Sequence, residues 1–252
     1  MTGITARALY QQRRPAPERS NNSLRRTYDL LRSSLHHSLE PGASLVEEEL
    51  VRTLSSSRNT VRAALQLLAQ EGLVSRGPKV GTMAQGSILL PFNDLLDVSD
   101  KVAYRMNTEV LEMSVMPAPS ILLKWLHLPT GASVLLLEML VLQDGEKVGL
   151  SVSYVGLTSD QQEELVGQPP DAIRFLEDIL HVRIGEAETT VSTLAADAQT
   201  AALLDIAEGT PMLWLEDFLR DEEGAPLAVT QLRYRGDRVA FSAKARRPSL
   251  AS

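Results

Sequence analysis

Apolar residues recur at spacings of three and four from Leu24 onward, which is the period of one face of an α-helix. They are Leu24, Tyr28, Leu31, Leu35 and Leu39. The sequence Glu40-Pro41-Gly42 then ends the pattern, because proline and glycine interrupt a helix. The chain is therefore predicted to contain a first amphipathic helix between Leu24 and Leu39.

A second helix is predicted directly after this break. Ser44 and Glu47 have the three-residue spacing of a capping box, in which each side chain accepts a hydrogen bond from an unpaired amide at a helix start. Glu48 and Glu49 continue an acidic run that suits a first turn, because the helix dipole attracts negative charge there. We expect this helix to end near Leu54.

A third helix follows a serine-rich turn. Ser57 is a favourable N-cap for a helix that ends near Gln70, and Gly72 suits the position just beyond its end. Four apolar positions with helical spacing are expected to face the core: Val61, Ala64, Leu65 and Leu68.

A short hairpin is predicted next, with strands over residues 73–76 and 80–83 and Gly77-Pro78-Lys79 at its tip. Three helices followed by such a hairpin are typical of a winged helix-turn-helix. We assign residues 23–84 to this domain. Residues 1–22 are polar and are expected to form a disordered arm.

The second half of the chain alternates strand-like and helical patterns. Residues 85–99 have no clear period and are interpreted as a linker, and long hairpins are predicted over residues 134–155 and 211–235. The first hairpin turns at Asp144-Gly145, a strong turn signal. Further expected elements are a strand over 182–192 and helices over 160–166, 171–180 with Asp171 as its cap, and 197–204.

Hairpins packed with helices indicate an α+β domain built on an antiparallel sheet. We assign residues 100–245 to this domain. The predicted organisation is thus an N-terminal winged helix-turn-helix joined to a C-terminal antiparallel-sheet domain.

The distribution of charge differs between the two halves. The chain has a net charge of −7, but residues 1–85 carry +5 and the remaining 167 residues carry −12. A basic front joined to an acidic back favours a polyanion-binding module attached to a domain with another task. The alternative is a solvated basic tail, since several arginines lie in the arm.

Other features limit the chemistry that the chain can perform. No cysteine is present, which excludes disulfides and favours a reducing, cytoplasmic location. No apolar run approaches the length of a membrane span, and the arm lacks the apolar segment of a secretion signal. The four histidines are not spaced as zinc ligands, and nucleotide-binding glycine loops and G-x-S-x-G elbows are absent. We expect neither a metal nor a cofactor.

The start of the third helix carries side chains suited to nucleic acid. Arg58, Asn59 and Arg62 cluster on one side of the helix; arginine can pair with guanine and asparagine with adenine. Ser57 and Thr60 can bind phosphate oxygens, and Arg76 and Lys79 of the hairpin can reach the minor groove or the backbone. The alternative for Arg58 and Arg62 is an ordinary solvated helix face.

The stretch Ser57-Arg58-Asn59-Thr60-Val61-Arg62-Ala63-Ala64-Leu65, with Glu71-Gly72-Leu73 and Gly81-Thr82, resembles the GntR family of bacterial repressors. The back half, with Asp144-Gly145, Tyr154 and Tyr234-Arg235-Gly236-Asp237-Arg238, resembles the UTRA effector domain of the HutC branch, which has a chorismate-lyase-like fold. The resemblance implies a homodimer that binds a palindromic double-stranded DNA operator under the control of a small-molecule effector.

One position departs from the family pattern. Members usually carry a basic residue near Glu48, where it contacts the DNA backbone, whereas this chain has Glu47-Glu48-Glu49. Either the contact is missing, or Arg25, Arg26 and the arginines of the arm replace it.

The effector positions depart from the family as well. Many relatives bind phosphorylated sugars through strand arginines and a hydroxyl at a helix start, and the matching positions here are Met139, Val141 and Asp171. An acidic residue that is common before the last strand is replaced by Ala228. The resemblance therefore implies an effector that is less anionic than a sugar phosphate. The candidate effector-binding residues are Met139, Val141, Ser151, Ser153, Tyr154, Glu188, Thr230 and Tyr234.

Each of these positions has a plainer explanation. Met139 and Val141 have the character of core residues, and Ser151 and Ser153 share one strand face that is either a pocket or solvent-exposed. For the whole chain the alternative is a chorismate-lyase-type enzyme or a metabolite-binding protein with an appended helical module. That alternative gives no role to the residues from Ser57 to Arg62.

Overall fold

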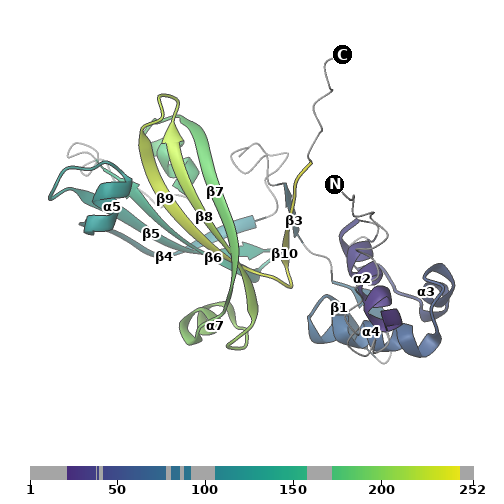
Figure 1. Ribbon diagram of the computed structural model, residues 1–252. Helices are drawn as coiled ribbons and strands as arrows, with labels where there is room; N and C mark the ends of the chain where they lie inside the picture. Colours follow the sequence, from purple (N-terminus) through teal and green to yellow (C-terminus); the bar gives the residue numbers. More distant parts are fainter. Residues whose placement is uncertain are drawn as a thin grey trace, which may run out of the picture. The chain divides into compact units, whose positions relative to one another are not determined.

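The computed structural model describes residues 22–37, 39, 42–77, 81–85, 88–91, 106–157 and 172–244 (Figure 1). The chain divides into two compact units, residues 1–86 and 87–252.

The described part of the first unit has three helices and a two-stranded hairpin. They are α2 (Asn22–His37), α3 (Glu47–Thr53), α4 (Arg58–Gln70), β1 (Val74–Gly77) and β2 (Gly81–Ala84). The predicted apolar faces of α2 and α4 form one core, with Leu31 and Leu35 of α2 packed against Leu65 and Leu68 of α4. This arrangement confirms the predicted helical region followed by a hairpin.

The start of α3 differs from the sequence prediction. Val46 is the N-cap and its side chain makes no capping hydrogen bond, so Ser44 and Glu47 do not form a capping box. Ser44 instead forms an isolated antiparallel bridge with Met83, and the amide of Leu45 donates to the carbonyl of Thr82. Pairing with β2 keeps the backbone at Ser44 extended, which delays the helix until Glu47.

The second unit is built on a six-stranded antiparallel sheet with the order β4-β5-β6-β9-β8-β7. The strands are β4 (Met106–Pro117), β5 (Ser133–Gln143), β6 (Glu146–Gly156), β7 (Ile184–Ala195), β8 (Pro211–Asp221) and β9 (Pro226–Arg235). Both predicted long hairpins are present. Asp144 and Gly145 have φ values of 49° and 86°, the left-handed pair that a tight two-residue hairpin requires.

Several elements of the second unit were missed by the sequence analysis. Strand β4 pairs with β5, but its register shifts between Val110 and Glu112, which breaks the alternation of apolar and polar positions. The short helix α5 (Ser120–Trp125) was missed as well. Strand β3 (Ile88–Pro91) lies within the segment interpreted as a linker and pairs in parallel with β10 (Val239–Ser242). The linker interpretation is thus wrong for these four residues.

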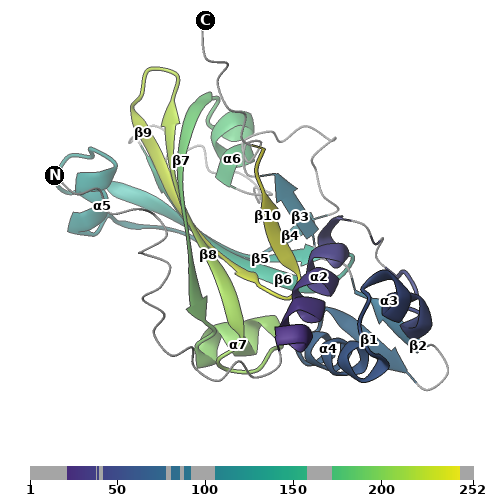
Figure 2. The same cartoon turned by 45° about the vertical axis from the view of Figure 1, so that its right-hand side comes forward.

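The helices of the second unit lie on opposite faces of the sheet. We call one face the α6 face, because α6 (Ala172–Arg174) and the following π-helical turn η2 (Phe175–Ile179) cover one end of it and the β3–β10 pair covers the other. The other is the α7 face, which carries α5 and α7 (Ala198–Leu204) at its two ends. Figure 2 shows α7 at the end of the long strands away from α6.

The caps and turns of this unit agree in part with the prediction. Asp197 caps α7 by accepting a hydrogen bond from the amide of Thr200 at 2.8 Å, which lowers the pKa of the Asp197 carboxyl. The predicted helix over 160–166 and the proposed cap Asp171 lie outside the described residues.

Candidate nucleic-acid interface and effector face

Helix α4 is fixed at its start and along one side. The hydroxyl of Ser57 accepts a hydrogen bond from the amide of Thr60 at 3.1 Å, which confirms Ser57 as the N-cap. All four side chains predicted to face the core are buried: Val61, Ala64, Leu65 and Leu68. Gly72 has a φ of 74°, as a residue just beyond a helix end often does. A helix held in this way presents its opposite side on a rigid base.

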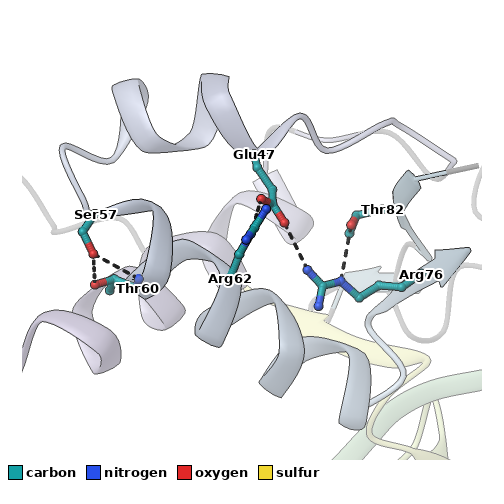
Figure 3. Close-up of polar contacts among 6 residues, drawn as sticks. All are labelled: Glu47, Ser57, Thr60, Arg62, Arg76 and Thr82. Atoms are coloured by element: carbon teal, nitrogen blue, oxygen red, sulfur yellow. Dashed lines mark hydrogen bonds and ion pairs between the residues drawn. The ribbon is translucent and has the colours of Figure 1, made fainter. Parts of the chain in front are cut away.

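Arg58, Asn59 and Arg62 are exposed on that opposite side. The side chains of Arg58 and Asn59 make no hydrogen bond or ion pair with another described residue. Ser57 and Thr60 lie at the same end, with their hydroxyl oxygens 2.7 Å apart (Figure 3). The structure therefore brings five of the seven predicted DNA-binding residues together at the start of α4.

The hairpin supplies a sixth residue. Arg76 lies on β1, and its Nε donates to the hydroxyl of Thr82 on β2 at 3.5 Å. The seventh, Lys79, lies outside the described residues.

An acidic side chain joins the helix to the hairpin. One carboxylate oxygen of Glu47 accepts from Nε of Arg62 at 2.7 Å, and the other pairs with Nη2 of Arg76 at 3.3 Å. Figure 3 shows Glu47 between the two arginines. We call Glu47, Arg62 and Arg76 the Glu47 cluster. From the sequence, Glu47 was expected to be a capping residue in a run that lacks a DNA contact. Its link to Arg62 and Arg76 could not be predicted because the three residues are far apart along the chain.

The effector candidates divide between the two faces of the sheet. Successive side chains of a strand point to opposite faces, and directly paired residues of neighbouring strands share a face. The register pairs Met139 with Ser151, Ser153 with Thr230, and Gly149 with both Val141 and Tyr234. Six candidates therefore share the α6 face: Met139, Val141, Ser151, Ser153, Thr230 and Tyr234.

The other two candidates lie elsewhere. Tyr154 follows Ser153 directly, so it is on the α7 face, where it packs in a cluster with Trp125 and Phe218. Glu188 pairs with Phe218 and is on the same face. The sheet does not bring Tyr154 and Glu188 together with the other six, because strand alternation places them on its other side.

Val141 and Tyr234 belong to the hydrophobic end of the α6 face. Both are buried under the β3–β10 pair, in a cluster with Ile88, Leu90 and Val239. The aromatic ring of Tyr234 lies directly over Gly149, where an added Cβ would come within 2.7 Å of it. These contacts give the two residues a packing role.

A row of polar side chains crosses the middle of the α6 face between the two hydrophobic ends. The hydroxyls of Ser153 and Thr230 are 3.0 Å apart, Thr230 pairs across strands with Asp217, and Asp217 pairs with Thr189. The hydroxyl of Thr189 donates to the Asp217 carboxylate at 2.6 Å. We call Ser153, Thr230, Asp217 and Thr189 the polar row.

Asp217 and Thr189 were not found from the sequence. Burial raises the pKa of the Asp217 carboxyl, against the opposing effect of the hydrogen bond from Thr189. The sequence does contain a signal for Asp217. It lies two residues from both Leu215 and Leu219, so strand alternation places it as a polar residue on an otherwise apolar face.

Within the described ranges, no group of His, Asp or Glu residues has the arrangement of metal ligands. Among the helices of that same part of the chain, none combines the length and apolar character needed to span a membrane.

Comparison with known families agrees with both units. Residues 24–83 match the family model described as "Bacterial regulatory proteins, gntR family". Residues 102–240, more than half of the chain, match the UTRA domain.

Similarity to known proteins extends over most of the chain. The transcriptional repressor PhnF of Mycolicibacterium smegmatis is 28% identical over 208 residues, covering 78% of this chain and 82% of that protein. The transcriptional regulator GgaR of Escherichia coli K12 is 24% identical over 210 residues, covering 82% of each chain. The crystal structure of PhnF from Mycobacterium smegmatis superimposes with a TM-score of 0.59 at 24% identity, covering 87% of this chain and 99% of that one.

The similar proteins are named as transcriptional regulators, which favours regulation over the alternative of a chorismate-lyase-type enzyme. The N-terminal unit provides a helical DNA-binding fold and the C-terminal unit an antiparallel sheet with a UTRA fold. This chain belongs to the GntR family of bacterial transcriptional regulators and carries a UTRA domain.

Proposed function

We propose that the protein is a repressor that binds a palindromic operator as a homodimer and responds to a small molecule bound at the α6 face. The DNA-binding part of this proposal rests on one observation. Arg58, Asn59 and Arg62 are exposed at the start of a helix whose other side is buried. The repressor PhnF, a relative over most of the chain, supports the direction of regulation.

The side chains fit the major groove in kind and position. Arginine can donate two parallel hydrogen bonds to O6 and N7 of guanine, and asparagine can pair with N6 and N7 of adenine. Ser57 and Thr60, at the same helix end, are suited to phosphate oxygens and would fix the helix on the backbone. Arg76 adds a positive charge from the hairpin.

Selection of duplexes from a randomised pool by the full-length protein tests this proposal. We expect enrichment of a two-fold symmetric sequence, and light scattering of the free protein should give the mass of a dimer. The triple variant R58A/N59A/R62A is the control and should enrich no sequence. Enrichment of no sequence by the wild type, or of the same sequence by the triple variant, would contradict the proposal.

The chemistry of the polar row supports an effector that is not a sugar phosphate. A half-buried carboxylate at Asp217 repels anions, whereas hydroxyls and a carboxylate together suit a neutral or cationic ligand with hydrogen-bond donors. Basic side chains are absent from the described cross-strand positions of the polar row and of the neighbouring Met139–Ser151–Leu232 row.

A thermal-shift screen of metabolites against the full-length protein tests the effector class. Neutral or cationic compounds should raise the unfolding temperature of the wild type and raise it less in Thr230→Val. Sugar phosphates should leave it unchanged. Stabilisation by a sugar phosphate that survives in Thr230→Val would show that the effector binds elsewhere and has another charge.

A further inference from the structure

The acidic run at the start of α3 contains one residue unlike its neighbours. Glu47 is 28% exposed and uses both carboxylate oxygens in ion pairs, whereas Glu48 and Glu49 are exposed and form no ion pair with the described part of the chain. The three residues carry the same charge in the same helical turn. The difference between them is that Glu47 faces α4 and the hairpin.

The ion pair with Glu47 restricts the orientation of Arg62 but does not use the N–H groups that could contact a base. Arginine has five N–H donors, and only the one on Nε is bound to Glu47. The two terminal nitrogens carry the remaining four donors, and they make no hydrogen bond with the described residues. Two parallel N–H groups at that end are what bidentate recognition of guanine requires.

The other arginine of the Glu47 cluster is held from two sides. Arg76 contacts Glu47 through Nη2 and Thr82 through Nε. Glu47 therefore connects the exposed side of α4 to the hairpin at a single point. An isolated flexible arginine would reach many bases and phosphates, whereas one bound through Nε has fewer orientations available.

Stability does not account for this arrangement. Arg62 is 60% exposed in its side chain and Arg76 is 36% exposed, and ion pairs in such positions contribute little to folding because water screens them. A carboxylate beside two DNA-binding arginines also weakens their attraction to phosphate at every sequence. The cluster thus reduces non-specific attraction while it restricts the orientation of Arg62.

We propose that Glu47 is a specificity-determining positioning residue, which orients Arg62 toward one base and lowers affinity for DNA of other sequences. The inference rests on the proposed DNA-binding function. It assigns a role to one residue of the acidic run in which the family's basic backbone contact, expected near Glu48, is missing. The protein would lose affinity for phosphate and gain discrimination between sequences.

Equilibrium binding of the full-length wild type, Glu47→Gln and Glu48→Gln provides the test. Each protein is titrated by fluorescence anisotropy against the duplex that the wild type selects and against a scrambled duplex of equal length. Glu47→Gln should reduce the ratio of the two dissociation constants about tenfold, within the range of one bidentate base contact. Glu48→Gln removes the same charge and should tighten both complexes alike, with the ratio unchanged.

A second pair of variants tests whether Glu47 acts through Arg62. In an Arg62→Ala background, Glu47→Gln should have no further effect on the ratio. Glu47→Ser, which also suits a first helical turn, replaces the glutamine variant if circular dichroism shows that the latter is unfolded.

The possible outcomes separate the inference from the function on which it rests. An equal ratio for Glu47→Gln and the wild type, or a loss that persists in the Arg62→Ala background, overturns the role of Glu47 and leaves the DNA-binding function intact. Failure of the wild type to distinguish the selected duplex from the scrambled one overturns both.

Discussion

The Glu47 cluster and the polar row are both networks of polar side chains, but they differ in solvent exposure and in charge. The Glu47 cluster has two arginines that keep more than a third of their side-chain surface in solvent. In the polar row Ser153 is fully buried, Thr230 is 7% exposed, and the hydrogen bonds join neutral hydroxyls or reach one half-buried carboxylate.

This difference matches two kinds of partner. Exposed charges can exchange one ion pair for another at small cost, which suits contact with a polyanion. Buried hydroxyls lose much more when a partner is removed, so they suit recognition of a particular arrangement of donors and acceptors. Changes in the Glu47 cluster should therefore alter binding and leave stability nearly constant, whereas changes in the polar row should alter stability first.

The largest effect is expected from Arg62→Ala. Loss of a base-reading arginine should weaken binding to the selected duplex by about 1–3 kcal/mol. The free energy of unfolding should stay within about 0.5 kcal/mol of the wild type, because the side chain is exposed. Anisotropy titration and urea denaturation measure the two quantities.

The matched control for Arg62→Ala is Gln70→Ala, an exposed position at the far end of α4, which should change neither quantity. A variant at Arg62 that binds DNA as tightly as the wild type would assign this arginine to an ordinary solvated surface.

Thr230→Val should show the opposite pattern. The substitution keeps the shape of the side chain but leaves the buried hydroxyl of Ser153 without its partner, which costs about 1–3 kcal/mol of unfolding free energy. Affinity for the selected duplex should not change. Thr190→Val, at an exposed position of β7, should alter stability by less than about 0.5 kcal/mol.

The double variant Ser153→Ala/Thr230→Val sharpens this prediction. It removes both hydroxyls and should recover part of the lost stability, because no polar group is left unpaired. A double variant whose loss of stability equals the sum of the losses of the two single variants would show that the hydroxyls act independently of each other.

Ser57 lies between these two cases, since it both caps α4 and is a candidate phosphate contact. Ser57→Ala should cost about 1 kcal/mol of stability through loss of the cap, as measured by thermal unfolding. Ser57→Asp keeps a capping oxygen and so retains stability, but its charge should repel phosphate and weaken DNA binding. Equal DNA affinity of Ser57→Asp and the wild type would show that Ser57 does not contact the DNA backbone.

The smallest predicted effect concerns pH and Asp217. Burial raises the pKa of this carboxyl in the folded state, so the folded chain keeps its proton over a pH interval in which the unfolded chain has lost it. The contribution of Asp217 to unfolding free energy therefore falls as pH rises from the pKa of the unfolded chain to the raised folded value. In Asp217→Asn this decline should disappear from urea denaturation curves recorded across the interval, and a decline that persists would have to come from another group.

Part of this structure could be predicted from the sequence because its signals are local. Ser57 and Gly72 delimit α4, the helical spacing of Val61 and Leu65 identifies the core side, and Asp144-Gly145 fixes a hairpin. Each signal depends on neighbouring residues within one element.

The features that were missed depend on contacts between distant segments. Strand β3 is short and is defined by its pairing with β10, some 150 residues later in the chain. The capping box at Ser44 is overridden by pairing with Met83, and Glu47 meets Arg76 only because the hairpin folds back beside α3. For the effector residues, the register between strands could not be predicted from the sequence, so Tyr154 and Glu188 were grouped with residues of the other face.

Protection of guanine N7 from methylation by dimethyl sulfate, in the duplex selected by the full-length protein, tests the central claim most directly. If α4 reads base edges in the major groove, the wild type should protect at least one guanine in each half of the symmetric site, and Arg62→Ala or Arg58→Ala should restore methylation at one of them. Protection of no guanine, or protection unchanged in both variants, would contradict the account.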